Sequence, residues 1–343
     1  MESQSKTRPL LLSRPRILAF RRRVGQLDRR VPEGTTALRR AAWAGLQDSA
    51  PRAALLSIHA RVHGTRADHW EHRSLVQLWG PRFSDYVVAE RDLAIFSLGR
   101  LPDGARGRTR AHDTADRLAR YLRGRRMPFG EAGRGMGVPP NSLRYAAATG
   151  TLLIRWDGAR QPVLWTVPAP SLSAPLARAE LARRYLHVFG PGTVAGFQRW
   201  AGVGAVEARR GFEALAGEIV PVRSPIGAGW ILAADEPEFA RRPDSAEGVR
   251  FLPSGDAYTL LWGADRALLE PEPKRRAALW TTRVWPGALL VQGELAGTWR
   301  RSAGEVSIDP WRRLSRDERA LVENEAAALP LPGLNADIRV RWS

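Results

Sequence analysis

Four histidines in one short stretch are the first residues whose types could do chemistry, because imidazole nitrogens bind transition metals. They are His59, His63, His69 and His72, and the first two share a face of an expected helix. No carboxylate stands with them in an H-E-x-x-H arrangement, and the chain contains no cysteine. We therefore expect a fortuitous cluster rather than a metal site, and the sequence implies no cofactor.

A glycine-rich run at residues 133–137 resembles a phosphate-binding loop only superficially. It follows an expected helix rather than a strand, and no G-K-[ST] sequence occurs in the chain. No G-x-S-x-G elbow is present either, so serine hydrolase chemistry has no anchor. The absence of cysteine excludes disulfides, thiolate metal sites and cysteine catalysis. These patterns disfavour NTPases and dinucleotide-dependent enzymes.

The charge of the chain points to a polyanionic partner. Its 343 residues contain 53 Lys and Arg against 35 Asp and Glu, a net charge of +18, and all but Lys6 and Lys274 of the basic residues are arginine. Nucleic acid is the first candidate partner and an anionic membrane surface the second. A membrane-surface protein would need a basic amphipathic helix with a strong aromatic face, which we do not find. No apolar run approaches the roughly 18 residues of a membrane span, so we expect a cytoplasmic, nucleoid-associated protein.

Two Trp-Arg-Arg triplets, at residues 299–301 and 311–313, are candidate phosphate contacts. In a strand, neighbouring side chains face opposite ways, so Trp299 could pack inward while Arg300 points outward. The alternative is an edge strand that uses arginines against aggregation.

Three hairpins recur along the chain, and they are the elements that must position such residues. Alternating apolar residues predict hairpins at residues 75–89, 150–168 and 217–235, whose starts lie 75 and 67 residues apart. Helices are expected at residues 35–62, with interruptions at Gly45 and near Pro51, and at residues 111–122. Helix–turn–helix pairs are expected at 129–137 with 141–145 and at 193–201 with 205–216. A helix–turn–helix followed by a hairpin is typical of a winged helix, whose second helix usually meets DNA.

The chain changes character near residue 246. Strands are predicted at residues 249–261, 280–291, 295–301, 305–308 and 338–342, with a helix at 315–329. We therefore predict an α+β fold of three tandem winged helices and a C-terminal β-rich domain. The expected parts are a flexible tail (1–12), three winged helices (13–103, 104–172 and 173–245) and the β-rich domain (246–343).

Several segments together resemble the AlkZ/YcaQ-type winged-helix DNA glycosylases, and the resemblance covers nearly the whole chain. The most informative one is Gly45-Leu46-Gln47-Asp48-Ser49-Ala50-Pro51-Arg52-Ala53-Ala54-Leu55-Leu56, where this family has a short glutamine-containing motif. The others are Arg184-Tyr185-Leu186, Phe189-Gly190-Pro191, Leu252-Pro253, Asp256-Ala257-Tyr258, Val291-Gln292-Gly293, Gly297-Thr298-Trp299-Arg300-Arg301 and Leu314-Ser315.

The resemblance implies a concave basic channel for duplex DNA, formed by three winged helices and a β-rich element. It also implies excision of alkylated purines, including bulky N7-guanine adducts and some crosslinks, in repair or in self-resistance to alkylating agents. The motif departs from the family pattern of glutamine, an apolar residue, then glutamine or aspartate. Gln47 matches the first glutamine, Asp48 takes the apolar position, and Ser49 takes the third.

The remaining groups can still act on a weakened glycosidic bond. An N7-alkylated purine leaves as a neutral base, so the enzyme needs a held water and negative potential near the sugar. The resemblance then points to Gln47 and Asp48 as the catalytic pair and to Ser49 as a water ligand. Alternatively, Asp48 or Ser49 caps the helix that begins near Ala50-Pro51.

The expected protein is a monofunctional glycosylase, because lyase chemistry needs an amine and neither lysine lies near the motif. The expected partner is double-stranded, alkylated DNA. The protein is expected to act as a monomer and not to bind a membrane. The expected DNA-binding residues are Arg52, Arg144, Arg300, Arg301, Arg312 and Arg313. The alternative is a non-catalytic DNA-binding or lesion-sequestering protein that keeps the scaffold.

Overall fold

Three antiparallel hairpins form the frame of the first two thirds of the chain, as the alternating apolar residues predict. We describe a computed structural model of the chain that covers residues 9–158, 160–302, 304–331 and 338–343. The hairpins are β3 (Leu75–Trp79) with β4 (Asp85–Ala89), β6 (Leu152–Arg155) with β7 (Val163–Thr166), and β8 (Ile219–Ser224) with β9 (Gly227–Leu232). All three pair antiparallel, so these predictions are confirmed.

Each hairpin also takes up one two-residue strand from elsewhere in the chain. These strands are β2 (Leu46–Gln47) on β4, β5 (Met127–Pro128) on β7, and β1 (Leu10–Leu11) on β8. The first two hairpins share one six-stranded sheet, in the order β2-β4-β3-β6-β7-β5, joined at the pair Gln77 and Ile154.

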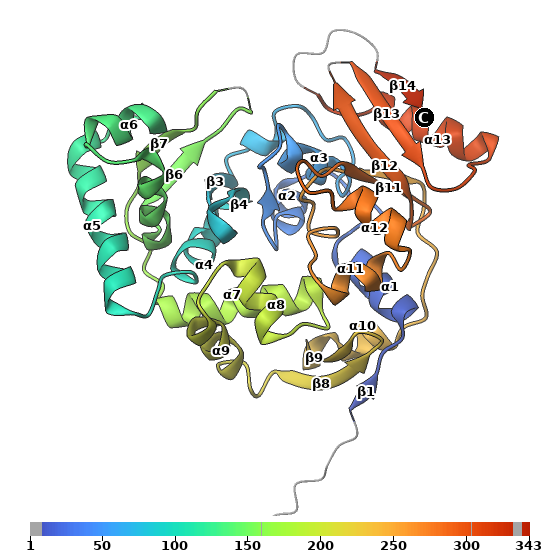
Figure 1. The fold of residues 1–343 in the computed structure, drawn as a ribbon, viewed down its shortest axis with the longest axis horizontal. Helices are drawn as coiled ribbons and strands as arrows, with labels where there is room; N and C mark the ends of the chain where they lie inside the picture. Colours follow the sequence, from blue (N-terminus) through green and yellow to red (C-terminus); the bar gives the residue numbers. More distant parts are fainter. Residues whose placement is uncertain (1–8, 159, 303, 332–337) are drawn as a thin grey trace, which may run out of the picture.

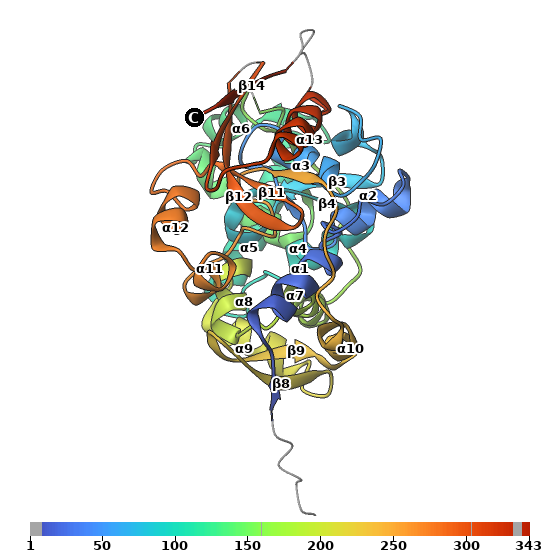
Figure 2. The same ribbon diagram turned by 90° about the vertical axis from the view of Figure 1, so that its right-hand side faces the viewer.

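The predicted flexible tail is wrong for its last residues. Leu10 pairs with Val222 in parallel, and Leu12 is buried in a cluster that includes Phe20 and Phe239. Figure 2 shows β1 beside β8 at the lower end of the molecule. The physical cause is that two alternate leucines of the tail find an apolar face on this sheet. The rest of the tail, residues 1–8, lies outside the described residues.

The helices of the first two thirds include, with one exception, those that the periodicity predicts, and also four that it does not predict (residues 14–24, 93–98, 174–189 and 236–240). The helices are α1 (Arg14–Val24), α2 (Thr35–Ala41), α3 (Ala53–His59), α4 (Leu93–Leu98), α5 (Ala105–Leu122), α6 (Phe129–Gly135), α7 (Ala174–Phe189), α8 (Val194–Ala201), α9 (Ala205–Glu213) and α10 (Glu236–Ala240). The helix predicted at 141–145 is instead part of a longer 3₁₀ segment, Pro140–Thr149. In the described part of the chain no helix is both long and apolar enough to cross a bilayer.

The C-terminal part is less strand-rich than predicted. Its sheet runs β10 (Val249–Leu252), β11 (Gly287–Val291), β12 (Glu294–Ser302), β13 (Glu305–Pro310) and β14 (Arg339–Trp342), in that order. Residues 253–261 form turns rather than strand, and two unpredicted helices follow, α11 (Ala264–Leu269) and α12 (Pro273–Leu279). The predicted last helix is confirmed as α13 (Arg316–Ala327), which begins at a capping box of Ser315 and Glu318.

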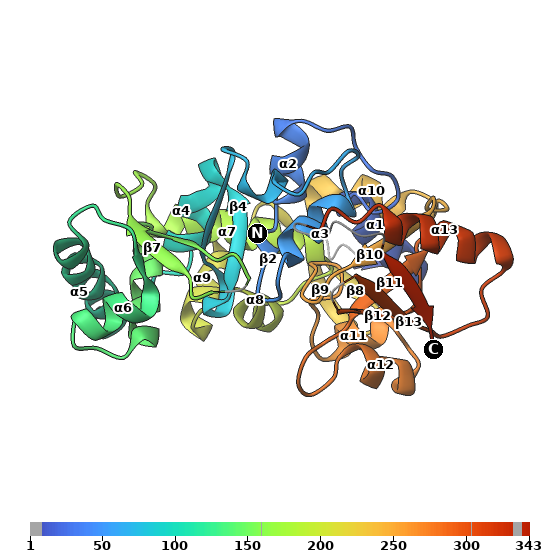
Figure 3. The ribbon, with the colours of Figure 1, turned by 90° about the horizontal axis from the view of Figure 1, so that it is seen from above.

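The lobes lie side by side around the first hairpin. In Figure 1, α5, α6 and the β6–β7 hairpin lie on one side, and β11–β14 with α13 lie on the other. Between them lie α2, α3 and the β3–β4 hairpin, with α7–α9 and β8–β9 below. Seen from above in Figure 3, β2 lies between these two ends of the molecule.

Buried ion pairs of arginine hold distant segments together. Arg184 binds Asp92 at 2.8 Å, Arg178 binds Asp103 at 3.0 Å, and Arg21 binds Asp265 at 2.8 Å. Each of these three guanidinium groups is nearly inaccessible to solvent. Part of the arginine excess therefore serves the interior and not a surface partner, since a buried charge needs a partner.

Candidate functional site

The glutamine-containing segment lies on β2, at the edge of the shared sheet. Leu46 pairs with Val87 and Gln47 with Tyr86 of β4. The chain enters β2 through Gly45, whose φ of 72° suits glycine. A Cβ there would come within 2.9 Å of the rings of Phe96 and Tyr86, so no side chain fits. The close packing of Gly45 on these two rings therefore fixes the position of the backbone that carries Gln47.

The amide of Gln47 has a defined orientation. Its Oε1 accepts hydrogen bonds from Arg82 Nη2 at 2.6 Å and from Tyr86 Oη at 3.3 Å. A guanidinium group has no acceptor, so the opposite amide orientation would place two donors together. The Nε2 group therefore faces the other way, and it donates to no acceptor among the described residues. Gln47 thus offers two free N–H donors.

Arg82 holds this orientation, and the sequence did not single it out. It lies in the β3–β4 turn with φ of 57°, followed by Phe83 with the same φ, a conformation unusual for residues other than glycine. Its guanidinium group also donates to the carbonyl of Trp200 and stacks on Trp262 at 5.0 Å. The position of Arg82 in the β3–β4 turn would indicate its role, but only once it is known that β2 pairs with β4.

Asp48 faces the protein interior, in contrast to the expectation that it could meet the water or the sugar. Only 1% of it is exposed. Its Oδ1 accepts from the backbone N–H of Ala54 at 2.9 Å, and its Oδ2 accepts from Gln77 Nε2 at 2.8 Å. The physical reason is the strand alternation, which turns Asp48 away from the side of Gln47. The capping alternative is right in part: Asp48 accepts an N–H of the first turn of α3, but the helix begins at Ala53 rather than near Ala50-Pro51 and its N-cap residue is Arg52.

Burial changes the acidity of this carboxyl group and of a neighbour. Desolvation raises the pKa of Asp48 from 3.8 to about 7, although the hydrogen bonds from Ala54 and Gln77 oppose it. Asp85, at the start of β4, accepts the Asp48 N–H with its carbonyl at 2.7 Å. Burial raises the pKa of the Asp85 carboxyl to about 6, against the charge of Arg144. The buried side of the motif therefore contains two carboxyl groups with raised pKa values, those of Asp48 and Asp85.

Ser49 is the exposed member of the three motif residues. Its hydroxyl can both donate and accept, so it can bind a water molecule beside the segment. Gln47, Asp48 and Ser49 therefore divide into an oriented amide, a buried carboxyl group and an exposed hydroxyl.

The C-terminal part of the chain completes this site. A Cβ on Gly255 would lie 3.1 Å from Gln47 Nε2, so the turn after β10 packs on the amide and its glycine leaves room beside it. Next to it, Asp256 is buried and binds Arg61 at 2.7 Å, and it also accepts from Ser57 Oγ at 2.7 Å. Both partners follow the motif on α3 or directly after it. The site is thus built from two ends of the chain.

The six predicted DNA-binding arginines differ in how free they are. Arg300 and Arg313 are exposed, and Trp299 is buried as predicted. Arg300 donates one hydrogen bond, from Nη2 to the carbonyl of Val284 at 2.9 Å. Arg52 and Arg301 are half-buried near the start of α3. Arg144 donates to the carbonyl of Phe83 and packs over Trp79, and Arg312 binds Glu318 through two hydrogen bonds. Arg144 and Arg312 are therefore already engaged within the chain.

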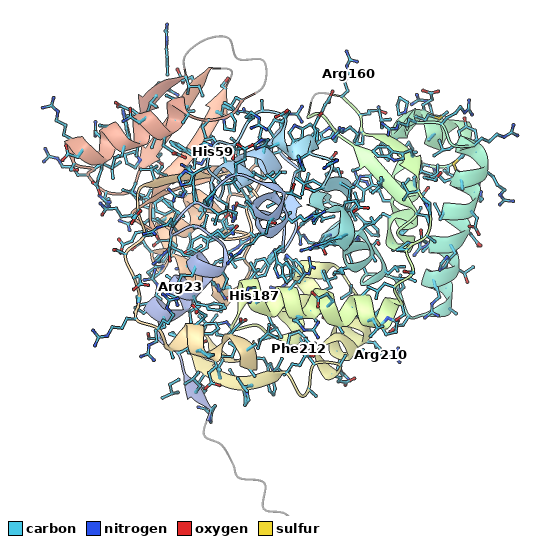
Figure 4. The ribbon with its side chains drawn as sticks, turned by 180° about the vertical axis from the view of Figure 1, so that it is seen from behind. Arg23, His59, Arg160, His187, Arg210 and Phe212 are labelled. Atoms are coloured by element: carbon cyan, nitrogen blue, oxygen red, sulfur yellow. The ribbon has the colours of Figure 1, made fainter. Side chains whose placement is uncertain are left out.

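The four histidines lie in different surroundings. His59, labelled in Figure 4, is buried on α3 and lies 3.1 Å from Glu325 of α13. His69 is buried near Glu33, whereas His63 is exposed. In the part of the chain that the structure describes, no three His, Cys, Asp or Glu side chains form a group that could hold a metal ion.

Comparison with known proteins identifies relatives of this chain. A solved structure, the Streptomyces sahachiroi DNA glycosylase AlkZ, matches with a TM-score of 0.76 at 18% identity, over 97% of this chain and 100% of the other. This likeness supports the fold. A curated relative from Streptomyces sahachiroi, named an interstrand DNA cross-link repair glycosylase, is 27% identical over 166 residues. That match covers 47% of this chain and 43% of the relative. The family model "DNA glycosylase AlkZ-like" matches residues 40–330, and by this match the chain belongs to the AlkZ-like DNA glycosylase family.

Proposed function

We propose that this protein is a monofunctional DNA glycosylase that removes alkylated purines from duplex DNA, with Gln47 as its catalytic residue. The observation that carries the proposal is the fixed amide of Gln47, whose oxygen is held by Arg82 and Tyr86 while its Nε2 group is free to donate. A donor with a fixed direction can hold a water molecule in one place beside the sugar, so that little freedom is lost when the water attacks. Membership of the family supports the reaction type.

The proposed mechanism uses the chemistry of the substrate. An N7-alkylated purine is cationic, leaves as a neutral base and needs little help from an acid, so the sugar develops oxocarbenium character. Gln47 Nε2 would donate to the oxygen of a water molecule, and the exposed Ser49 hydroxyl would accept from that water. A lone pair of the water would form the bond to C1′ as the C1′–N9 bond breaks and its electrons go to the base, and the proton of the water would leave to solvent past Ser49. Asp48 is a positioning residue in this scheme, because it binds Ala54 N–H and so fixes the turn that carries Gln47 and Ser49.

We infer a DNA-binding surface from the units that surround this segment. The three sets of helices and hairpins are proposed to be winged-helix units with the boundaries given above, and with the C-terminal domain they would enclose a basic channel for duplex DNA. Arg52, Arg300, Arg301 and Arg313 are the proposed phosphate contacts. Arg312 is left out because it is paired with the carboxylate of Glu318, and Arg144 because it packs over Trp79 and donates to the carbonyl of Phe83. The protein is proposed to act as a monomer on chromosomal DNA.

The test is excision of N7-methylguanine from a duplex, detected as alkali-labile abasic sites under single-turnover conditions. Gln47→Ala should lower the rate on the order of a hundredfold, the typical cost when a reacting group is no longer held in position. The matched control is Gln161→Ala, an exposed glutamine that accepts from Gly130 N–H and should leave the rate unchanged.

A second outcome would favour the non-catalytic alternative, which the serine at the third motif position supports. If wild-type protein excises no alkylpurine but binds alkylated duplex more tightly than plain duplex, the protein sequesters lesions. If Gln47→Ala and Gln161→Ala behave alike, the catalytic role of Gln47 is wrong.

A further inference from the structure

Three arginines from separate parts of the chain meet beside the start of α3. Arg52 precedes α3, Arg155 ends β6, and Arg301 lies on β12. The guanidinium carbon of Arg52 lies 4.3 Å from the ring centre of Trp70, and that of Arg155 lies 4.8 Å from the same ring. Trp70 is buried, and two cationic groups lie against its ring. The geometry fixes the direction of both side chains, because the planar guanidinium group stacks on the indole.

The third arginine reaches the same place through Pro51. Arg301 Nη2 donates to the carbonyl of Pro51 at 3.3 Å, next in the chain to Arg52. The turn of the β6–β7 hairpin also touches Pro51, since a Cβ on Gly158 would lie 2.9 Å from its Cβ. Three segments of the chain thus converge on residues 51 and 52. The arrangement is built by the fold and not by one flexible loop.

The charges at this place are poorly balanced. Among the described residues, Arg155 pairs with Glu71 at 3.5 Å, between two side chains that are each almost half exposed. Arg52 is near enough to the buried Asp48 carboxyl for its charge to lower the pKa of that group, but makes no ion pair with it. Burial lowers the pKa of Arg301, and the positive charge of Arg52 lowers it further. Arg52 Nη1 is buried without a hydrogen-bond partner among the described residues. Such a cluster is unfavourable until an anion neutralises it.

The backbone of Arg52 adds an independent sign of function. Its φ of 64° places a residue other than glycine in the left-handed region, which costs free energy and is retained mainly where the surroundings require it. Here that conformation directs the side chain towards Trp70 and Arg155.

We propose that Arg52, Arg155 and Arg301 form a clamp for a single backbone phosphate of the DNA strand that carries the lesion. Guanidinium groups bind phosphate oxygens through paired hydrogen bonds, which suits a tetrahedral anion better than a carboxylate. The proposal rests on the proposed function, because it assumes that Gln47 faces the damaged nucleotide. Gln47 and Arg52 are five residues apart, so their Cα atoms lie at most about 17 Å apart. One strand of a duplex advances about 3.4 Å per nucleotide, so we expect the phosphate within about five nucleotides of the lesion. Phosphate contacts of this kind set the register of the protein on the duplex.

The experiment removes one phosphate charge at a time. Duplexes carry N7-methylguanine on a 2′-fluoro sugar, which resists excision, and one methylphosphonate at each of the five positions on either side of it. Wild-type protein should lose about tenfold in affinity at one position of the lesion strand, corresponding to about 1.4 kcal/mol. The double variant Arg52→Ala, Arg155→Ala should bind the unmodified duplex about tenfold more weakly. It should lose nothing further at that position.

The control is Arg120→Ala, an exposed arginine on α5, which should retain the position-specific loss. If the double variant melts early, Arg155→Ala alone gives the same comparison, because its side chain is exposed. A position-specific loss that persists unchanged in the variants would overturn the clamp, and so would equal losses at all positions. Failure of wild-type protein to bind any duplex would overturn both proposals. Binding with the expected loss but without excision would support the clamp while the catalytic proposal fails.

Discussion

Replacing Asp48 by alanine should destabilise the protein more at acidic pH than at alkaline pH. The folded protein holds the carboxyl proton more tightly than the unfolded chain, since burial raises the pKa from 3.8 to about 7. As the pH rises through this window, the unfolded chain releases the proton first and the folded state loses stability. A tenfold change in proton affinity corresponds to about 1.4 kcal/mol, so the wild-type protein loses about 4 kcal/mol over the whole window through this group.

Asp48→Ala loses two hydrogen bonds at every pH, but it has no buried carboxyl group whose ionisation would lower its stability as the pH rises. The N–H of Ala54 and the amide of Gln77 would lose their acceptor, at about 1–3 kcal/mol each. The cost of the substitution should therefore fall by roughly 2–3 kcal/mol between about pH 5 and pH 8.

Urea unfolding followed by tryptophan fluorescence, at several pH values, measures this difference. Ser49→Ala is the matched control, because this neighbour is exposed and does not titrate. A cost for Asp48→Ala that stays constant from pH 5 to pH 8 would refute the reasoning that burial dominates the acidity of this group.

Four further outcomes are expected. Arg82→Ala should lower single-turnover excision by roughly tenfold to a hundredfold by freeing the amide of Gln47, and Arg82→Lys should recover part of that loss. The logarithm of the duplex-binding constant should fall steeply with the logarithm of the salt concentration, with a slope of about −0.9 per phosphate contact. The double variant Arg300→Glu, Arg301→Glu should show a flatter slope for all DNA sequences alike. Asp256→Ala should cost about 3–5 kcal/mol in urea unfolding, because its arginine partner would remain buried and unpaired. Excision should survive dialysis against a chelator, and stoichiometric zinc in the dialysed protein would contradict this.

The hairpins could be predicted from the sequence because their signals are local. Alternation of apolar residues and a turn of glycine or proline define a hairpin without knowledge of its neighbours. Because the signal is local, the strand predicted at 249–261 is too long. Residues 253–261 carry apolar side chains, as a strand would, but they fold as turns around the buried carboxylate of Asp256. A partner as distant as Arg61 leaves no local pattern.

The site could be found only in part. The resemblance identified the segment around Gln47, but the inward direction of Asp48 depends on how β2 pairs with β4. The roles of Arg82 and Gly255 cannot be predicted from the sequence, because both arise from contacts with Gln47, which lies on another element. Arg144 and Arg312 are positive in sequence but are occupied within the fold.

The ion pair between Arg61 and Asp256 also has a consequence for synthesis on the ribosome. The two residues are 195 positions apart in the chain. At translation rates of about 5–20 residues per second, the guanidinium group waits roughly 10–40 s for its carboxylate. During that interval α3, which follows the glutamine segment, lacks the partner that neutralises the arginine next to it. A chain that ends before residue 255 already contains Arg82 and Tyr86, which hold the oxygen of Gln47, but it lacks the turn that packs on the amide nitrogen and leaves Ser57 and Arg61 without their carboxylate.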